Sequence, residues 1–182
     1  MHGAPCAVAI APRGYGDDGE PSLLHLGVAY DGSVESRSAL QTAIALARRC
    51  HGELTVLTVA DYPHYGYATA WSVLSAGEIV DAERRSKQAI LDEGLAAIPS
   101  GVQAGGRLLT GAAGNQLSDA SADFDLLVVG SRAYGSMRRT LLGSTTRKLI
   151  HSAGCPVLVM PRGTEADSLG MVPEPAEFAD RV

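Results

Sequence analysis

The sequence predicts an α/β fold in which a parallel β-sheet carries helices on both of its faces. Short apolar segments alternate along the chain with longer segments whose apolar residues recur at helical spacing. The segment Asp125–Gly130 contains two leucines followed by two valines, which is typical of a central strand that is covered on both faces. Strands and helices that alternate in this way form a parallel sheet with right-handed crossovers.

The first strand is predicted at Leu23–Tyr30, and the first helix directly after it. The strand segment is apolar and ends at the turn sequence Asp-Gly-Ser. Ser33 is a candidate N-cap, Arg48 and Arg49 suit the last helical turn, and Gly52 is placed to end the helix.

The middle of the chain predicts two strands and one long helix. Leu54–Ala60 is nearly all apolar or β-branched and predicts a buried strand. A loop at Asp61–Tyr67 is followed by a helix from about Ser72 to Ile98. Val102–Leu109 contains two adjacent glycines, which an edge strand tolerates better than a central one.

The last third of the chain completes the alternation. A short helix is predicted near Ala113–Ala122, before the strand Asp125–Gly130. Gly143 and Ser144 open another helix that runs to about Ser152. A final strand lies at Pro156–Pro161.

Length and charge limit the function classes. The chain has 182 residues, enough for one domain and a tail, and a formal net charge of −5. A broadly basic surface for nucleic acid is therefore not indicated. No apolar segment is long enough to span a bilayer, and the start of the chain lacks the features of a signal peptide. We expect a cytoplasmic protein that binds neither nucleic acid nor membrane.

Neither the cysteines nor the histidines predict a metal site. Cys6, Cys50 and Cys155 are far apart in the sequence, and the five histidines lack the spacing of metal ligands. We expect no metal, and three reduced, buried thiols.

The start of the chain repeats its last predicted strand. Residues 2–14 match residues 151–163 in His, Ala, Cys, Val, Pro, Arg and Gly, in register. We interpret residues 1–14 as the final strand of a preceding, similar domain, with a linker at 15–22. The segment Ala7–Ala11 is expected to add to the exposed edge at Val157–Val159, in its own chain or in a second copy.

Two loops are candidates for a binding site. In an open parallel sheet the ligand crevice lies beyond the carboxyl ends of the strands, here after Tyr30 and Val129. The first loop begins with Asp31, whose carboxylate could serve a ligand or only the turn. The second is rich in glycine and arginine and leads to Gly143 and Ser144 at a helix start, which favours an anion such as phosphate. It matches neither the Walker P-loop nor the dinucleotide-binding glycine motif.

These loops resemble the universal stress protein family. Gly130, position 133, and Gly143 followed by Ser144 resemble that family's Gly-x2-Gly-x9-Gly-Ser/Thr nucleotide motif, and Asp-Gly-Ser after the first strand is similar too. The resemblance covers about Leu23 to Arg162. It implies a Rossmann-like, open five-stranded parallel sheet in the order 3-2-1-4-5, and a nucleotide-binding domain at 23–162. We expect residues 163–182 to be a disordered tail.

The resemblance also implies a ligand and a form of assembly. The ligand is an adenine nucleotide, ATP with Mg²⁺, bound by a stress-response regulatory domain. The assembly is a homodimer or a pairing with a tandem similar domain, through antiparallel last strands. The implied binding residues are Ala29, Asp31, Val59, Val129, Gly130, Ala133, Gly143, Ser144 and Thr145.

Each implied residue has an expected role. Asp31 would meet the adenine or the ribose, and Val59 would line the adenine pocket. Gly130, Gly143, Ser144 and Thr145 would hold the phosphates and the ribose. Ala29 and Val129 would contribute backbone contacts.

One departure from the family motif leaves the function open. Ala133 stands at the second motif glycine, where a Cβ either blocks approach to a phosphate or costs about 1 kcal/mol if φ must be positive. A protein-interaction domain of the same family that does not bind nucleotide therefore stays an alternative. A nucleotidyl transferase or hydrolase is a third hypothesis. The sequence indicates no nucleophile and base for such a reaction, so we expect no enzyme and assign no catalytic residue.

Overall fold

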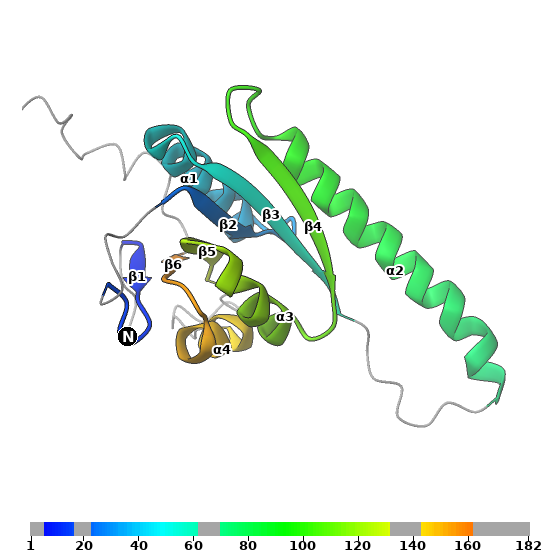
Figure 1. Ribbon diagram of the computed structural model, residues 1–182. Helices are drawn as coiled ribbons and strands as arrows, with labels where there is room; N and C mark the ends of the chain where they lie inside the picture. The colour runs from blue at the N-terminus through cyan, green and yellow to red at the C-terminus, as the bar shows by residue number, and fades with distance from the viewer. Residues whose placement is uncertain (1–5, 17–22, 62–69, 132–142, 162–182) are drawn as a thin grey trace, which may run out of the picture.

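The computed structural model describes residues 6–16, 23–61, 70–131 and 143–161. They form one mixed sheet with strand order β1-β6-β5-β2-β3-β4 (Figure 1). The strands are β1 (Val8–Ile10), β2 (His25–Ala29), β3 (Glu53–Ala60), β4 (Ala104–Thr110), β5 (Leu126–Gly130) and β6 (Val157–Met160). The helices are α1 (Val34–Cys50), α2 (Ala70–Ala96), α3 (Ala113–Ala120) and α4 (Ser144–Ser152), and a 3-10 turn η1 spans Ser121–Asp123.

The prediction of a five-stranded parallel sheet is confirmed in part, because the sheet has six strands and one of them is antiparallel. That strand is the segment Ala7–Ala11, whose addition to the edge at Val157–Val159 was predicted and is confirmed. β2 to β6 run parallel in the order β4-β3-β2-β5-β6, with β4 at one edge. β1 adds a sixth strand on the outer side of β6, and it runs antiparallel. The physical reason is that β6 would otherwise leave an unpaired apolar edge.

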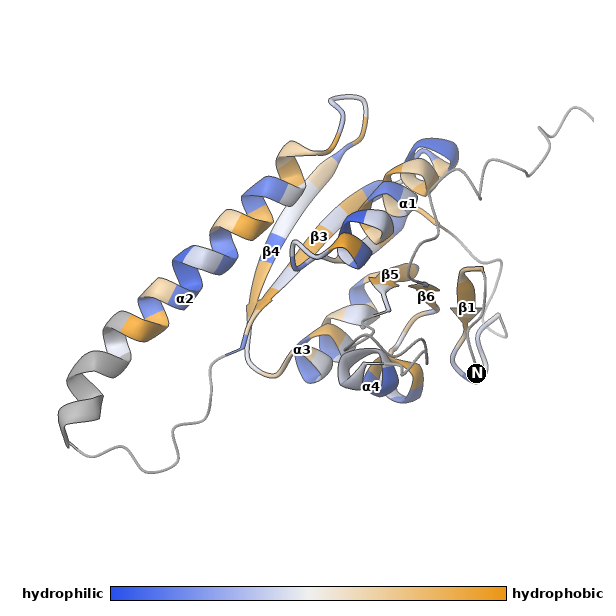
Figure 2. Ribbon diagram, turned by 180° about the vertical axis from the view of Figure 1, so that it is seen from behind, coloured by the Kyte–Doolittle hydropathy of each residue, from blue (hydrophilic) through white to orange (hydrophobic). Residues whose placement is uncertain are grey.

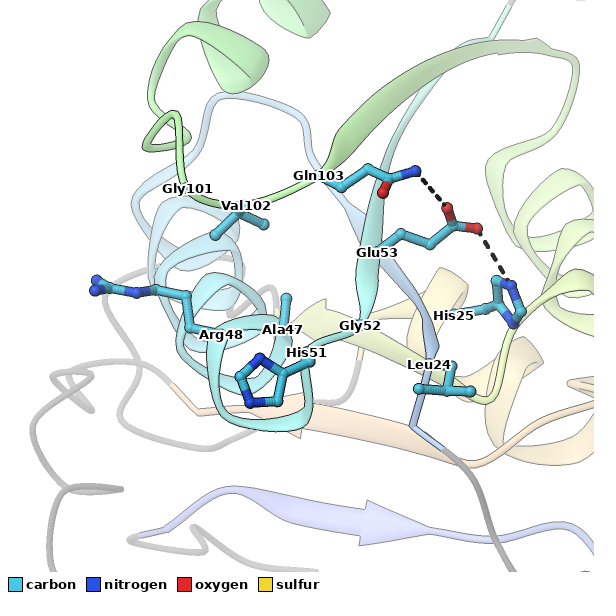
Figure 3. A pocket seen from close by; sticks show the side chains of 10 residues that line it. All are labelled: Leu24, His25, Ala47, Arg48, His51, Gly52, Glu53, Gly101, Val102 and Gln103. Atoms are coloured by element: carbon cyan, nitrogen blue, oxygen red, sulfur yellow. Dashed lines mark hydrogen bonds and ion pairs between the residues drawn. The ribbon is translucent and has the colours of Figure 1, made fainter.

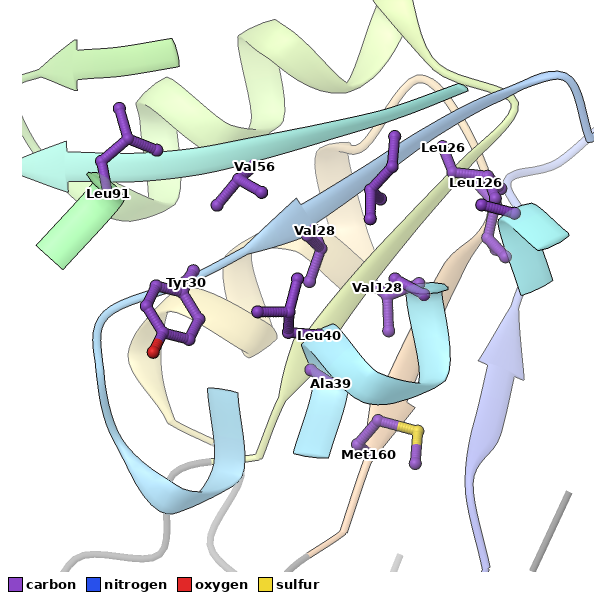
Figure 4. Packing of buried hydrophobic residues seen from close by; sticks show 13 residues of the cluster. Leu26, Val28, Tyr30, Ala39, Leu40, Val56, Leu91, Leu126, Val128 and Met160 are labelled. Atoms are coloured by element: carbon purple, nitrogen blue, oxygen red, sulfur yellow. The ribbon is translucent and has the colours of Figure 1, made fainter. Parts of the chain in front are cut away.

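Two apolar clusters lie on the two faces of the sheet. Val28 and Val128 point to the face covered by α1 and by the second half of α2, where Leu91 is buried (Figure 4). Leu127 packs on the other face against Leu117 of α3 and Leu149 of α4. Successive strand residues alternate between these faces, as a covered sheet requires. Figure 2 shows hydrophobic residues along β5 and β6 and a mixture of hydrophobic and hydrophilic residues along the helices.

The start of α1 agrees with the sequence, and its end does not. Ser33 caps the helix, because its Oγ accepts a hydrogen bond from the Ser36 N–H at 3.2 Å. The prediction that Gly52 ends the helix is confirmed only in part: the left-handed residue is His51 with φ 53°, while the Gly52 N–H donates to the Ala47 carbonyl of the last turn at 3.0 Å. Gly52 has a second role. A Cβ there would lie 2.6 Å from the carbonyl oxygen of Leu23, so the strand entry requires glycine.

α2 extends beyond the sheet that it covers. Its carboxyl-terminal half packs on β3 and β4, whereas the ribbon before it runs past the sheet (Figure 1). Ile79 and Val80 in this projecting part are 47% and 36% exposed. The helix begins two residues before the prediction and ends at Ala96, two residues before the predicted Ile98.

The expectation of three buried thiols is wrong for two of them. Cys155 is buried, Cys50 is half-buried and Cys6 is exposed. Cys6 lies just before β1, the outermost strand of the sheet. The predicted linker at 15–22 and tail at 163–182 lie largely or wholly outside the described residues, as does most of the loop at 61–67.

Candidate functional site

The carboxyl ends of β2 and β5 lie side by side, because these strands are parallel neighbours. Asp31 and Gly130 are therefore at the same edge of the sheet. Ala29, Val59 and Val129 share the sheet face that carries α3 and α4. Of these three side chains, Val129 is buried and the other two are half-buried. The structure thus brings five of the predicted residues to one edge.

The carboxylate of Asp31 is already used by the turn that leads into α1. Its Oδ1 atom accepts hydrogen bonds from the backbone N–H of Ser33, at 3.1 Å, and from the Ser33 hydroxyl. The Asp31 N–H donates to Ser36 Oγ at 3.3 Å. Gly32 between them has φ +77°, a conformation that favours glycine. The turn alone therefore explains why the sequence Asp-Gly-Ser stands here, and binding a ligand would be a second role of Asp31.

Gly130 has a packing reason for being glycine. A Cβ at this position would lie 2.8 Å from the backbone carbonyl carbon and oxygen of Glu35 in the first turn of α1. α1 can thus approach the end of β5 only because residue 130 lacks a side chain. The motif glycine serves this close approach whether or not a phosphate binds beside it.

Two helices begin next to each other at this edge. α4 begins at Ser144 after the cap residue Gly143, and α3 begins after the cap residue Ala112. Neither cap residue has a side-chain oxygen, so neither can satisfy the first backbone N–H groups of its own helix. The helix starts are in contact, since a Cβ on Gly114 would lie 3.7 Å from the Cα of Thr145 and 3.1 Å from Lys148 Cβ. Ser144 is exposed and Thr145 is half-buried.

Such an arrangement favours a negatively charged group. Each helix N-terminus presents backbone N–H groups and a partial positive charge, and both helices point theirs toward the same edge. Lys148 adds a full positive charge one turn into α4. Ala133, the remaining predicted residue, lies outside the described residues.

Sequence reasoning missed a polar network behind this edge. The Tyr30 hydroxyl donates to Glu93 Oε1 at 2.9 Å, and Arg37 donates to the same oxygen at 2.9 Å. Burial raises the pKa of Tyr30, and the hydrogen bonds from Tyr30 and Arg37 lower the pKa of Glu93. The network fixes α2 to the loop after β2. Only the contact between distant segments reveals it, because Glu93 is 63 residues from Tyr30.

A pocket of about 380 Å³ lies at the opposite, amino edge of the sheet. Figure 3 shows Glu53 at its side, accepting from Gln103 Nε2 at 3.1 Å and pairing with His25 Nε2 at 3.3 Å. Its lining residues are Leu24, His25, Ala47, Arg48, His51, Gly52, Glu53, Gly101, Val102 and Gln103. None of the predicted site residues is among them, and no sequence motif pointed to this edge.

The described part of the chain lacks two further classes of feature. No three His, Cys, Asp or Glu residues lie there in a group that could hold a metal ion. Within the same ranges, no helix has both the length and the apolar character needed to cross a bilayer.

Comparisons with known proteins support the resemblance seen in the sequence. A family model described as the universal stress protein family matches residues 24–161. A universal stress protein of Mycobacterium tuberculosis is 28% identical over 142 residues, covering 73% of this chain and 46% of the relative. The chain thus spans about half the length of this mycobacterial relative. The universal stress protein YxiE of Bacillus subtilis is 29% identical over 143 residues, covering 73% of this chain and 95% of the relative.

Solved structures agree with these relatives. The universal stress protein UspA from Lactobacillus plantarum has a TM-score of 0.62 at 25% identity, over 78% of this chain and 99% of that one. A universal stress protein family member from Burkholderia pseudomallei has a TM-score of 0.59 at 27% identity, over the same shares.

Proposed function

Because the chain belongs to the universal stress protein family, we propose that this stress-response domain is regulatory and binds ATP, with Mg²⁺, at the carboxyl edge of its sheet. No catalytic residue is assigned. The observation that carries the proposal is the pair of helix starts, α3 and α4, whose cap residues have no side-chain oxygen. A nucleotide phosphate supplies the charge and the acceptors that such helix ends favour.

The proposed pose uses the two ends of the edge differently. Phosphates lie over Gly143, Ser144 and Thr145, where the first turn of α4 offers N–H groups and hydroxyls. The adenine lies toward Val59 and Ala29, which provide half-buried apolar surface near the carboxyl ends of β3 and β2. Asp31, held by its turn, accepts a hydrogen bond from the ribose or the adenine.

Isothermal titration with ATP and MgCl₂ tests the proposal. We expect micromolar binding of ATP and much weaker binding of GTP. Ser144→Ala is expected to weaken ATP about tenfold, as for the loss of one hydrogen bond to a charged group. The matched control is Ser100→Ala, an exposed serine in the turn before β4 at the other edge of the sheet.

The titration also decides between the two functions left open by the sequence. If the unaltered chain gives no heat and no thermal shift with millimolar ATP, nucleotide binding is rejected. The replacement of the second motif glycine by Ala133 then favours the protein-interaction domain.

We propose further that the outer edge of β6 is the surface through which the domain assembles with a second copy or a similar domain. Its support is the apolar character of β6 and its position as the last parallel strand of the sheet.

A further inference from the structure

β1 pairs with β6 as if it were a second copy of β6. The sequence match between residues 2–14 and 151–163 makes Val8, Ala9 and Ile10 equivalent to Val157, Leu158 and Val159. In the sheet Val8 is opposite Val159, Ala9 is opposite Leu158, and Ile10 is opposite Val157. Val8, the equivalent of Val157, thus lies opposite Val159, and Ile10, the equivalent of Val159, lies opposite Val157.

This register has a local two-fold axis at the pair of Ala9 and Leu158. An antiparallel pair of identical strands has such an axis, and it would place Leu158 opposite Leu158 of the partner. The two faces also agree. Ala7 and Leu158 pack against the cluster under α1, whereas Ile10 packs against the cluster under α3 and α4. A second β6 could therefore replace β1 without changing which side chains point to which core.

β1 makes a weaker contact with β6 than β6 of a second copy would make. It has three residues, of which Ala9 is exposed and Val8 and Ile10 are half-buried. At the axis β1 supplies an alanine, whereas a second β6 would supply a leucine and bury more apolar surface. A second β6 thus makes the stronger contact with β6, whereas β1 binds there without the entropic cost of bringing two chains together.

We infer that β1 masks the assembly edge of β6 and competes there with β6 of a second copy. The chain is monomeric while β1 is docked, and it dimerises by β6 pairing, centred on Leu158, when β1 leaves. This inference rests on the proposed assembly through β6 and adds its regulation.

Two charged substitutions in β1 release the edge without altering β6. Val8→Asp with Ile10→Asp puts carboxylates against the apolar cluster and unpairs β1. The matched control, Val34→Asp with Ile79→Asp, adds the same charges at residues that are 71% and 47% exposed. By sedimentation equilibrium we expect the first variant to dimerise with a Kd at least tenfold lower than the unaltered chain, and the control to behave like the unaltered chain.

A cysteine at the axis reports the geometry of the dimer. Leu158→Cys is made in a full-length chain that also carries Cys6→Ser and Cys50→Ser, with and without the two β1 substitutions, and circular dichroism checks the fold. Residues directly opposite in an antiparallel pair have Cα atoms about 4.5–5.5 Å apart, which suits a disulfide. We expect mild oxidation to give covalent dimers only when β1 is disrupted. Ala9→Leu, which makes β1 more like β6, should reduce dimerisation of the unaltered chain.

The remaining outcomes distinguish masking by β1 from assembly through β6. Equal crosslinking with intact and disrupted β1 would overturn the masking and leave assembly through β6 standing. Dimers of the β1 variant that do not crosslink at position 158, or no dimers at all, would overturn assembly through β6 itself. Neither result bears on ATP binding, which the titration measures separately.

Discussion

Gly94 of α2 lies directly against the ring of Tyr30, so that a Cβ at position 94 would stand 2.9 Å from the Tyr30 Cδ1 atom. The ring has little freedom to move away. It is 3% exposed, and its hydroxyl is bonded to Glu93 on the same helix. The glycine therefore sets how closely α2 approaches the loop that carries Asp31.

Gly94→Ala should lower the free energy of unfolding by up to about 2 kcal/mol. Overpacking costs about 1–3 kcal/mol, and alanine recovers up to about 1 kcal/mol of helix propensity. Gly77→Ala in the same helix is the control, because its Cβ would meet nothing within 4 Å. It should raise stability by up to about 1 kcal/mol in urea unfolding. If both variants gain stability, the Tyr30 contact is not restrictive.

Gly130→Ala should destabilise the protein by about 1–3 kcal/mol even when no nucleotide is present. The Cβ would collide with the backbone of Glu35, which cannot rotate away as a side chain can. Gly101→Ala, at an open position, should change stability little. Thermal unfolding in nucleotide-free buffer measures both. A Gly130→Ala protein of unaltered stability that binds ATP less well would instead assign this glycine to the ligand alone.

Cys155 should make the protein less stable at high pH. Burial raises the pKa of its thiol from the ordinary value of 9.0 to about 11. Between these values the unfolded chain loses the proton while the folded chain keeps it, so the free energy of unfolding falls as the pH rises from about 9 to about 11. The loss is at most about 3 kcal/mol. Urea unfolding of Cys155→Ala should show a smaller decrease over this interval, and an identical pH dependence would contradict the assignment.

Ala133→Gly should strengthen ATP binding and change the stability of the unliganded protein little. The substitution restores the family motif at one position and adds no group that could bind. Titration with ATP and MgCl₂ measures the effect. Weaker binding by the glycine variant would show that the alanine is accommodated and that its Cβ does not restrict access.

The sequence predicted features that depend on neighbours in the chain. Ser33 caps α1 through Ser36, three residues away, and β5 is central because its residues are apolar on both faces. The family motif likewise lies in two local segments. Val8 and Val159 are remote in the sequence, yet their pairing was predictable. The repeat of residues 2–14 at 151–163, together with the family resemblance, predicted that β1 pairs with β6 in the antiparallel direction.

Features that depend on remote contacts were not predictable. The sequence does not reveal that Glu35 limits the space at Gly130, or that Tyr30 and Arg37 share one oxygen of Glu93. The end of α1 was mispredicted for a related reason. A glycine shortly after a helix suggests the left-handed position, but the left-handed residue is His51, and Gly52 is required by its close contact with the backbone of Leu23.

Because β1 is covalently connected to the sheet, a second copy can displace it from β6 only above a certain protein concentration. Residues 11–24 join β1 to β2, and a short connection of this kind holds a segment at an effective concentration on the order of millimolar. The effective concentration of β1 does not change on dilution, whereas the concentration of a second β6 equals that of the protein itself. Dimerisation would therefore respond to the amount of protein in the cell, and the length of residues 11–24 would set the amount at which it begins.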